Sequence, residues 1–296
     1  MIKIVFLLAL SVTMGTAKNL LSKTCPPQKV YRFNSIVFFI AFLFSFTFIG
    51  LGISGSGLNF APYILLMAVL YAGLTLVAQI AYIKAVAVGD FAISSFMYSC
   101  GFVIPAIVGA LIYHEDVTVS QIIGLIVLIA SFVVGSLRRT GGKTGNLWLF
   151  LSLSAMMASG AIGLLQKVYS HSIYKADLDS LLTPAFLLMS VVSAILAFTK
   201  VKPTTALATT ANENYKENLL VLFAFLLGVV VLAQNKTNLF LSGALDSMIT
   251  FPVINGGTVV VSALCDFFIL KKKPDLRKII SIFMGIIAII LIAIKV

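Results

Sequence analysis

The chain has 296 residues, of which 60% are apolar and only 10% are charged, and its mean hydropathy is +1.10. Soluble domains carry roughly 25% charged residues, so this composition excludes a soluble globular protein. A membrane-spanning helix needs about 20 residues, so ten of them would occupy roughly 200 residues and leave only short connections. The net charge of +11 is explained by basic residues near helix ends, so we expect no nucleic-acid partner.

Ten apolar segments of spanning length follow one another along the chain: residues 2–21, 34–53, 62–83, 91–113, 119–137, 146–169, 180–199, 218–241, 247–270 and 276–295. Short segments rich in Gly, Pro or charge separate them, because Gly and Pro interrupt helices. These include Cys25-Pro26-Pro27, Gly50 to Gly57, Arg138 to Lys143, Lys200 to Glu217 and Lys271 to Pro274. The stretch from Lys200 to Glu217 is the longest, and we predict that it is disordered.

The sequence contains signs of an internal duplication, which is the signature of repeat architectures. A shift of 145 residues superposes Leu8, Gly15 and Leu20 on Leu153, Gly160 and Leu165. Because the first segment has this counterpart, we expect a membrane helix there rather than a cleaved signal peptide. A shift of 157 residues superposes Ala87, Ala106, Ile112, Ile122 and Ile123 on Ala244, Ala263, Ile269, Ile279 and Ile280.

Each half of the chain holds five segments, which is an odd number, so the second half would enter the membrane from the opposite side. We therefore predict an all-α membrane protein with about ten transmembrane helices in two inverted five-helix repeats, residues 1–139 and 146–296.

This arrangement resembles the drug/metabolite transporter superfamily, and in particular its ten-helix EamA-like family. The motifs that carry the resemblance are Tyr82-Ile83-Lys84-Ala85, Ser94-Ser95, Pro105, Glu115, Gln121 to Gly124, Pro252, Asn255-Gly256-Gly257 and Leu276-Arg277-Lys278. The resemblance implies a carrier fold over nearly the whole chain and does not name a cargo. One departure is that Lys272 occupies the position that pairs with Glu115, where relatives often have an acidic residue.

Two apolar segments contain helix breakers at related positions of the two halves. Gly101 and Pro105 fall in the fourth segment, and Pro252 and Asn255 to Gly257 fall in the ninth. Inverted-repeat transporters bind substrate at interrupted helices near the bilayer midplane. We therefore expect both segments to be broken beside a cavity, although a simple kink packed against neighbouring helices would give the same pattern.

Polar side chains inside apolar segments usually face protein or water, because an unpaired polar group is costly in hydrocarbon. The candidate substrate-binding residues on this basis are Gln79, Tyr82, Lys84, Ser95, Tyr98, Gln166, Gln234, Asn235, Lys236, Thr250 and Asn255. Lys84 and Lys236 could neutralise an anionic cargo or extend to the membrane surface. A Ser or Thr could instead bond its own helix turn, and a Tyr could belong to the interfacial belt.

All ten acidic residues lie at or near connections, so the sequence identifies no proton carrier. Asp177 and Asp179 beside Lys175 could hold a metal-bound diphosphate, or they could belong to a solvated loop. There is no HExxH motif, and the three cysteines have no metal-binding spacing. We predict no cofactor, no bound metal and no enzymatic activity.

Sixteen of the 21 Lys and Arg lie in or beside the connections that follow the odd-numbered segments. Basic residues are retained in the cytoplasm, which predicts a multi-pass protein of the plasma or inner membrane with both termini outside. The family resemblance implies the opposite orientation.

The predicted function is secondary transport of a small polar or amphiphilic metabolite by alternating access through a central cavity. The alternatives are a membrane enzyme acting on a lipid-linked phosphate and a non-transporting scaffold or receptor.

Overall fold

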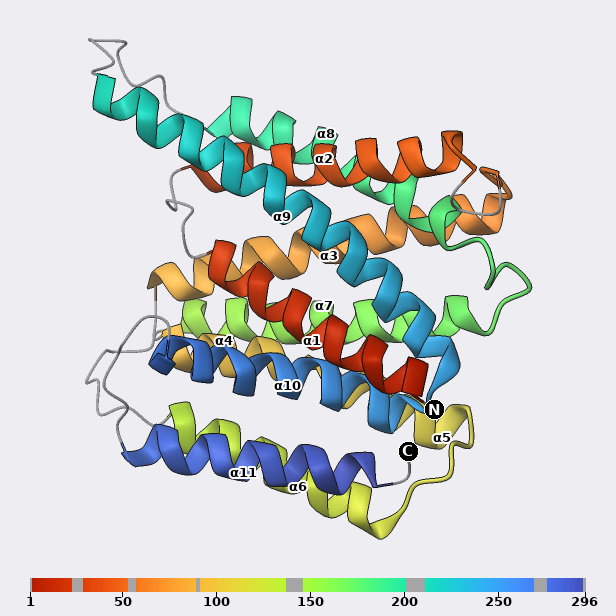
Figure 1. The fold of residues 1–296 in the computed structure, drawn as a ribbon, viewed down its shortest axis with the longest axis vertical. Helices are drawn as coiled ribbons and strands as arrows, with labels where there is room; N and C mark the ends of the chain where they lie inside the picture. Colours follow the sequence, from red (N-terminus) through yellow and green to blue (C-terminus); the bar gives the residue numbers. More distant parts are fainter. Residues whose placement is uncertain are drawn as a thin grey trace. The chain divides into compact units, whose positions relative to one another are not determined.

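The computed structural model describes residues 2–22, 29–52, 57–88, 91–136, 146–200, 211–268 and 276–294. These residues form eleven α-helices and one short 3-10 helix, with no strand among them (Figure 1). The elements are α1 (Ile2–Ser22), α2 (Val30–Gly50), α3 (Pro62–Val88), α4 (Phe91–Ser99), η2 (Cys100–Phe102), α5 (Val103–Ile112), α6 (Val119–Ser136), α7 (Asn146–Ser170), α8 (Leu178–Lys200), α9 (Ala211–Ala244), α10 (Ser247–Phe268) and α11 (Leu276–Ala293).

Eight of the described helices are long and apolar enough to cross a membrane, with Ser94–Ile112 counted as one of them. Helices form in these runs because a chain in hydrocarbon must satisfy its backbone N–H and C=O groups internally. Two shorter apolar helices, Val119–Val134 and Ile279–Ala293, accompany them. The prediction of an all-α membrane protein is therefore confirmed.

Every predicted apolar segment contains a helix, but one boundary prediction is wrong. Residues 211–217, which we expected to be disordered, begin α9. A helix continues into polar sequence at little cost once the membrane portion has formed its first turns. Cys25-Pro26-Pro27, Arg138 to Lys143, residues 201–210 and Lys271 to Pro274 lie outside the described residues.

The two predicted helix breaks have different outcomes. The fourth segment is interrupted at Gly101, where η2 separates α4 from α5. The expected break in the ninth segment is wrong, because α10 continues through Pro252 from Ser247 to Phe268. Its glycines serve close packing instead: a Cβ on Gly256 would lie 2.8 Å from Leu128, and one on Gly257 would lie 2.8 Å from Val12.

The chain divides into two compact units. Unit 1 comprises Met1–Thr16, Leu74–Ile173 and Asn238–Val296, and unit 2 comprises Ala17–Gly73 and Tyr174–Thr237. The chain passes between the units inside the continuous helices α1, α3 and α9, and once more after Ile173.

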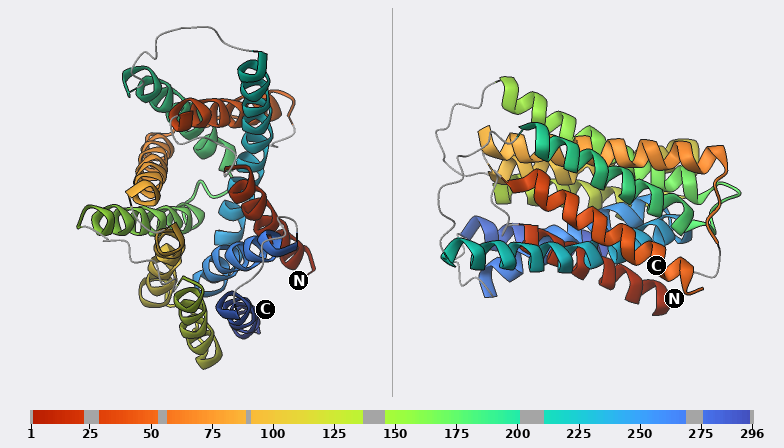
Figure 2. Two further views of the ribbon diagram at one scale, coloured as in Figure 1. Left: turned by 90° about the vertical axis from the view of Figure 1, so that its left-hand side faces the viewer. Right: turned by 90° about the horizontal axis from the view of Figure 1, so that it is seen from above.

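Unit 1 is built around paired helices. α6 and α11 lie side by side along their lengths, as the views in Figures 1 and 2 show. Gly124 allows this approach, because a Cβ there would lie 2.9 Å from the Ala288 carbonyl oxygen. The buried core between the helices includes Leu8, Phe102, Leu128, Phe132, Leu241, Ile249, Phe251, Val253, Ile254, Ala288 and Ile292.

Unit 2 contains a second helix pair, α2 with α8. Ser35 and Ser190 exchange hydrogen bonds across it: the Ser35 hydroxyl donates to the Ser190 carbonyl at 3.1 Å, and the Ser190 hydroxyl donates to the Ser35 carbonyl at 3.0 Å. Phe38 and Phe186 stack beside them, with ring centroids 6.5 Å apart.

Candidate functional site

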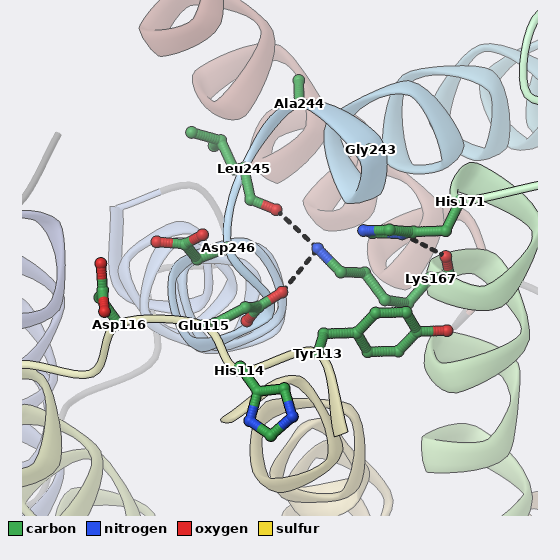
Figure 3. Close-up of a pocket in the computed structure, with 10 residues that line it drawn as sticks. All are labelled: Tyr113, His114, Glu115, Asp116, Lys167, His171, Gly243, Ala244, Leu245 and Asp246. Carbon is green, nitrogen blue, oxygen red and sulfur yellow. Dashed lines mark hydrogen bonds and ion pairs between the residues drawn. The ribbon is translucent and has the colours of Figure 1, made fainter. Parts of the chain in front are cut away.

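A polar pocket of about 430 Å³ opens at one end of unit 1 (Figure 3). Three parts of the chain form it: the connection between α5 and α6, the end of α7, and the connection between α9 and α10. Its lining residues are Tyr113, His114, Glu115, Asp116, Lys167, His171, Gly243, Ala244, Leu245 and Asp246. Four of these ten are Asp, Glu or Lys, in a protein with only 10% charged residues.

Glu115 contacts both Lys167 and Ser247 in the pocket. Its carboxylate lies 2.6 Å from the Lys167 ammonium, and the side chains are 7% and 5% exposed. The same carboxylate accepts hydrogen bonds from the Ser247 backbone N–H at 2.7 Å and the Ser247 hydroxyl at 3.1 Å. Ser247 is the first residue of α10, so the negative charge sits at the positive end of the helix dipole.

Local backbone geometry directs Glu115 into this position. His114 has a φ of +51°, a left-handed conformation that is uncommon for residues other than Gly. The chain thereby turns back, and the Glu115 N–H donates to the Gly109 carbonyl at 3.2 Å. The carboxylate then lies over Gly109, where a Cβ would be only 2.4 Å from it. Gly109 is therefore required for the space that the carboxylate occupies.

Lys167 approaches Glu115 from the last turn of α7. Its ammonium also donates to the Leu245 carbonyl at 3.1 Å, just beyond the end of α9. The His171 Nδ1 lies 3.0 Å from the Lys167 carbonyl oxygen, which makes Nδ1 the donor. The Tyr113 ring packs on His171 with centroids 4.5 Å apart, so contacts from three parts of the chain meet around Lys167.

Three of the candidates predicted from the sequence form one cluster in unit 1. The Tyr82 and Ser95 hydroxyls are 2.8 Å apart, and the rings of Tyr82 and Tyr98 have centroids 5.0 Å apart. The Tyr98 hydroxyl is hydrogen-bonded to Ser159 on α7. Lys84, which follows on the same helix as Tyr82, is exposed near the end of the apolar span.

The other candidates in unit 1 are Gln79, Gln166, Thr250 and Asn255. Gln79 is half-buried on α3 and Gln166 is buried beside Lys167 on α7. The Thr250 hydroxyl donates to the Asp246 carbonyl at 3.0 Å, one turn earlier. The Asn255 amide donates to the Phe251 carbonyl at 3.1 Å in the same way.

The three candidates on α9 lie in unit 2, and two of them have polar partners there. Asn235 accepts a short hydrogen bond from the Tyr71 hydroxyl and donates to the Val231 carbonyl at 2.7 Å. Lys236 forms an ion pair with Asp179 at 2.6 Å. Gln234 is buried.

The ion pair corrects one prediction about the acidic residues. Asp179 does not belong to a solvated loop: it lies in the first turn of α8 and is 6% exposed. Asp177 accepts a hydrogen bond from the Asn59 amide at 3.0 Å. Sequence reasoning placed Glu115 and Asp179 near connections, but it gave no sign that they would be buried with lysine partners.

Among the described residues, the fold and these sites define a helical membrane protein in which Lys167 pairs with Glu115 in a buried position and the partly exposed Lys236 pairs with the buried Asp179. No model of a known protein family matches the sequence, and no curated protein matches it. The chain is similar to a solved structure described only as "Crystal structure of protein", with a TM-score of 0.72 and 11% identity, over 99% of this chain and 97% of that one. At this identity the similarity shows the fold alone.

Proposed function

We propose that the chain is a secondary transporter that carries a small polar or amphiphilic metabolite across a membrane by alternating access. The observation that carries this proposal is the open polar pocket of about 430 Å³, with the buried Lys167–Glu115 pair in its wall. Its volume lies in the range of small-molecule sites. Ionisable residues in a membrane helix bundle commonly mark solute or ion pathways.

Helix pairing supports an inverted-repeat architecture of ten membrane helices. If residues 1–139 and 146–296 are the repeats, the second, fourth and fifth helices of each repeat pack on their own counterparts: α2 on α8, α5 on α10 and α6 on α11. Ser35 and Ser190, which bond each other reciprocally, are 155 residues apart, close to the shifts of 145 and 157 found in the sequence. The same architecture accounts for the resemblance to the EamA-like family.

Close packing between η2 and α7 gives the proposed carrier a surface along which helices can shift. Cβ atoms on Gly101 and Gly160 would meet backbone atoms of the facing segment at 2.7 Å. Small residues at such contacts let membrane helices approach closely. In this proposal the Tyr82, Ser95 and Tyr98 cluster provides polar groups and aromatic faces for the solute.

We further propose that the protein resides in the plasma or inner membrane with both termini outside, because this orientation leaves most basic residues in the cytoplasm. A reporter that is active only in the cytoplasm, fused to either terminus, tests the orientation. An active reporter would reverse it without affecting the transport proposal.

Solute recognition can be tested by a thermal-shift screen of purified protein against pools of small metabolites. A solute that binds the native state raises the unfolding temperature, and we expect that shift to disappear in Lys167→Met. Lys175→Met is the matched control, because Lys175 is exposed and lies outside the pocket. Flux of the identified solute into proteoliposomes then tests transport. Chemical conversion of the solute would instead support the membrane-enzyme alternative, and binding without flux would support a receptor.

A further inference from the structure

The Glu115–Lys167 ion pair joins three segments that are far apart in the sequence. Glu115 holds the connection after α5 to the start of α10 through Ser247, and Lys167 holds the end of α7 to the end of α9 through Leu245. The 2.6 Å contact between the two charges connects these two attachments. Figure 3 shows the pair with Leu245 and Asp246 around it.

Buried polar groups adjoin the pair and the pocket along the chain. Ser242 is fully buried, and its hydroxyl donates to the Gln166 carbonyl at 3.2 Å. Gln166 precedes Lys167 on α7, and Ser242 precedes the pocket-lining residue Gly243 on α9. A solute that passed from the pocket into unit 1 between these two helix ends would therefore meet the ion pair first.

We propose that the Glu115–Lys167 pair is a latch that closes the pocket end of unit 1 and opens when the two charges separate. This inference rests on the proposed transport function, for which it names the gate. While the pair is intact, the connection between α5 and α6 is held against α7 and α10, and Ser242 is sealed from water. When the pair separates, the connection swings away and the ends of α7 and α9 become accessible.

Two features make this pair suitable as a reversible latch. The attraction between buried charges is largely offset by the cost of removing both from water, so the closed state is held by a small net free energy. The left-handed backbone at His114 stores strain in the closed arrangement. A conformational change can release that strain when the carboxylate leaves its place over Gly109.

Lys167 keeps a partner in the open state, because its ammonium remains bonded to the Leu245 carbonyl just beyond the end of α9, and helix C-termini attract cations. Glu115 leaves Ser247 together with the connection between α5 and α6, and water in the open pocket then solvates the carboxylate.

The test measures how quickly a cysteine at position 242 reacts with a membrane-impermeant maleimide. The full chain is placed in lipid nanodiscs, with Cys25, Cys100 and Cys265 replaced by Ala and Ser242 replaced by Cys. We expect labelling to be slow with the pair intact and at least about tenfold faster in Lys167→Met and in Glu115→Gln, since a buried pair is strongly destabilised when one partner is removed. The exchanged pair Glu115→Lys with Lys167→Glu provides the reciprocal test, and we expect partial recovery of slow labelling.

A cysteine in place of Ser131 controls for general loosening. Ser131 is buried on α6 in the same unit and lies outside the pocket. Faster labelling at 242 with unchanged labelling at 131 supports the latch. Equal acceleration at both positions, or no acceleration at 242, overturns it. A confirmed latch in a protein that moves no solute would refute the transport function separately, since this readout requires no substrate.

Discussion

The carboxylate of Asp179 lies 2.6 Å from the ammonium of Lys236 within unit 2. The Ser45 hydroxyl donates to the same carboxylate at 3.4 Å, and the Phe48 ring centroid lies 6.0 Å from the Lys236 ammonium. The pair connects the first turn of α8 to the last third of α9. Because the Asp179 carboxylate is buried and Lys236 is largely covered, loss of one partner is expected to be more harmful than loss of both.

We therefore predict that Asp179→Asn lowers the free energy of unfolding by about 2–4 kcal/mol, somewhat less than for a fully buried pair because the Lys236 side chain is 27% exposed. The double variant Asp179→Asn with Lys236→Met should recover part of the loss. Thermal unfolding in detergent measures both, with Asp177→Asn as the control for a change of charge near the same helix end. If the free energy of unfolding fell equally in the single and the double variant, the ion pair would make no specific contribution to stability.

The second prediction concerns the space over Gly109. A Cβ there would lie 2.4 Å from the Glu115 carboxylate and 2.6 Å from Ser247, so Gly109→Ala should displace the carboxylate from Lys167 and lower the unfolding temperature. Gly73→Ala is the matched control on α3, where a Cβ would meet nothing within 4 Å. That control should be neutral or stabilising by roughly 0.5–1 kcal/mol, because Ala is a better helix former than Gly. If Gly109→Ala left the unfolding temperature unchanged, the connection between α5 and α6 would be able to shift and make room for the added methyl group.

A third prediction concerns the contact at the 3-10 turn. A Cβ on Gly101 would lie 2.7 Å from the Met156 carbonyl oxygen and 2.8 Å from the Gly160 nitrogen. Backbone atoms cannot rotate away, so Gly101→Ala should cost about 1–3 kcal/mol, as overpacking does in other cores. Gly50→Ala, where nothing lies within 4 Å, should leave stability nearly unchanged. The unfolding temperatures of the two purified variants give the comparison, and similar values would contradict the prediction.

The fourth prediction tests the Tyr82 and Ser95 cluster as a solute-binding group. Their hydroxyls share one hydrogen bond of 2.8 Å, so Tyr82→Phe, Ser95→Ala and the double variant should weaken solute binding by similar factors. Groups that act together are not additive. Titration with a solute from the thermal-shift screen measures the three affinities, with Tyr63→Phe as a control because Tyr63 stacks on Tyr174 in unit 2. If the binding free energy lost in the double variant equalled the sum of the losses in the two single variants, Tyr82 and Ser95 would not act together on the solute.

Much of the fold was predictable because a chain in lipid must satisfy its backbone hydrogen bonds internally, which favours helices. Each apolar run of spanning length became a helix, and the interruption at Gly101 was signalled by the residue itself. The break expected at Pro252 is absent from α10. The glycines that suggested it, Gly256 and Gly257, instead let Leu128 and Val12 pack closely on the helix. Composition could not separate these two uses of glycine.

The candidate site was less predictable, because its members meet through tertiary packing. Tyr82 and Ser95 were predicted to bind substrate in a cavity, and the structure places their hydroxyls 2.8 Å apart. Glu115 and Lys167 are 52 positions apart and both lie near helix ends, where sequence alone suggests exposure to water. A weak signal was present in Lys167 itself, which lies among apolar and small residues of α7 rather than beyond them.

The pairing of α6 with α11 has a consequence for the order in which the protein is made. α6 is complete once residue 136 has been synthesised, but its most extensive neighbour does not exist until the ribosome has added Ala293. More than half of the protein is therefore synthesised while α6 lacks that neighbour. During this time the apolar face of α6 that α11 will cover is exposed to incorrect contacts. Loss of the final helix, by a premature stop codon or by proteolysis, would leave α6 in that immature condition permanently.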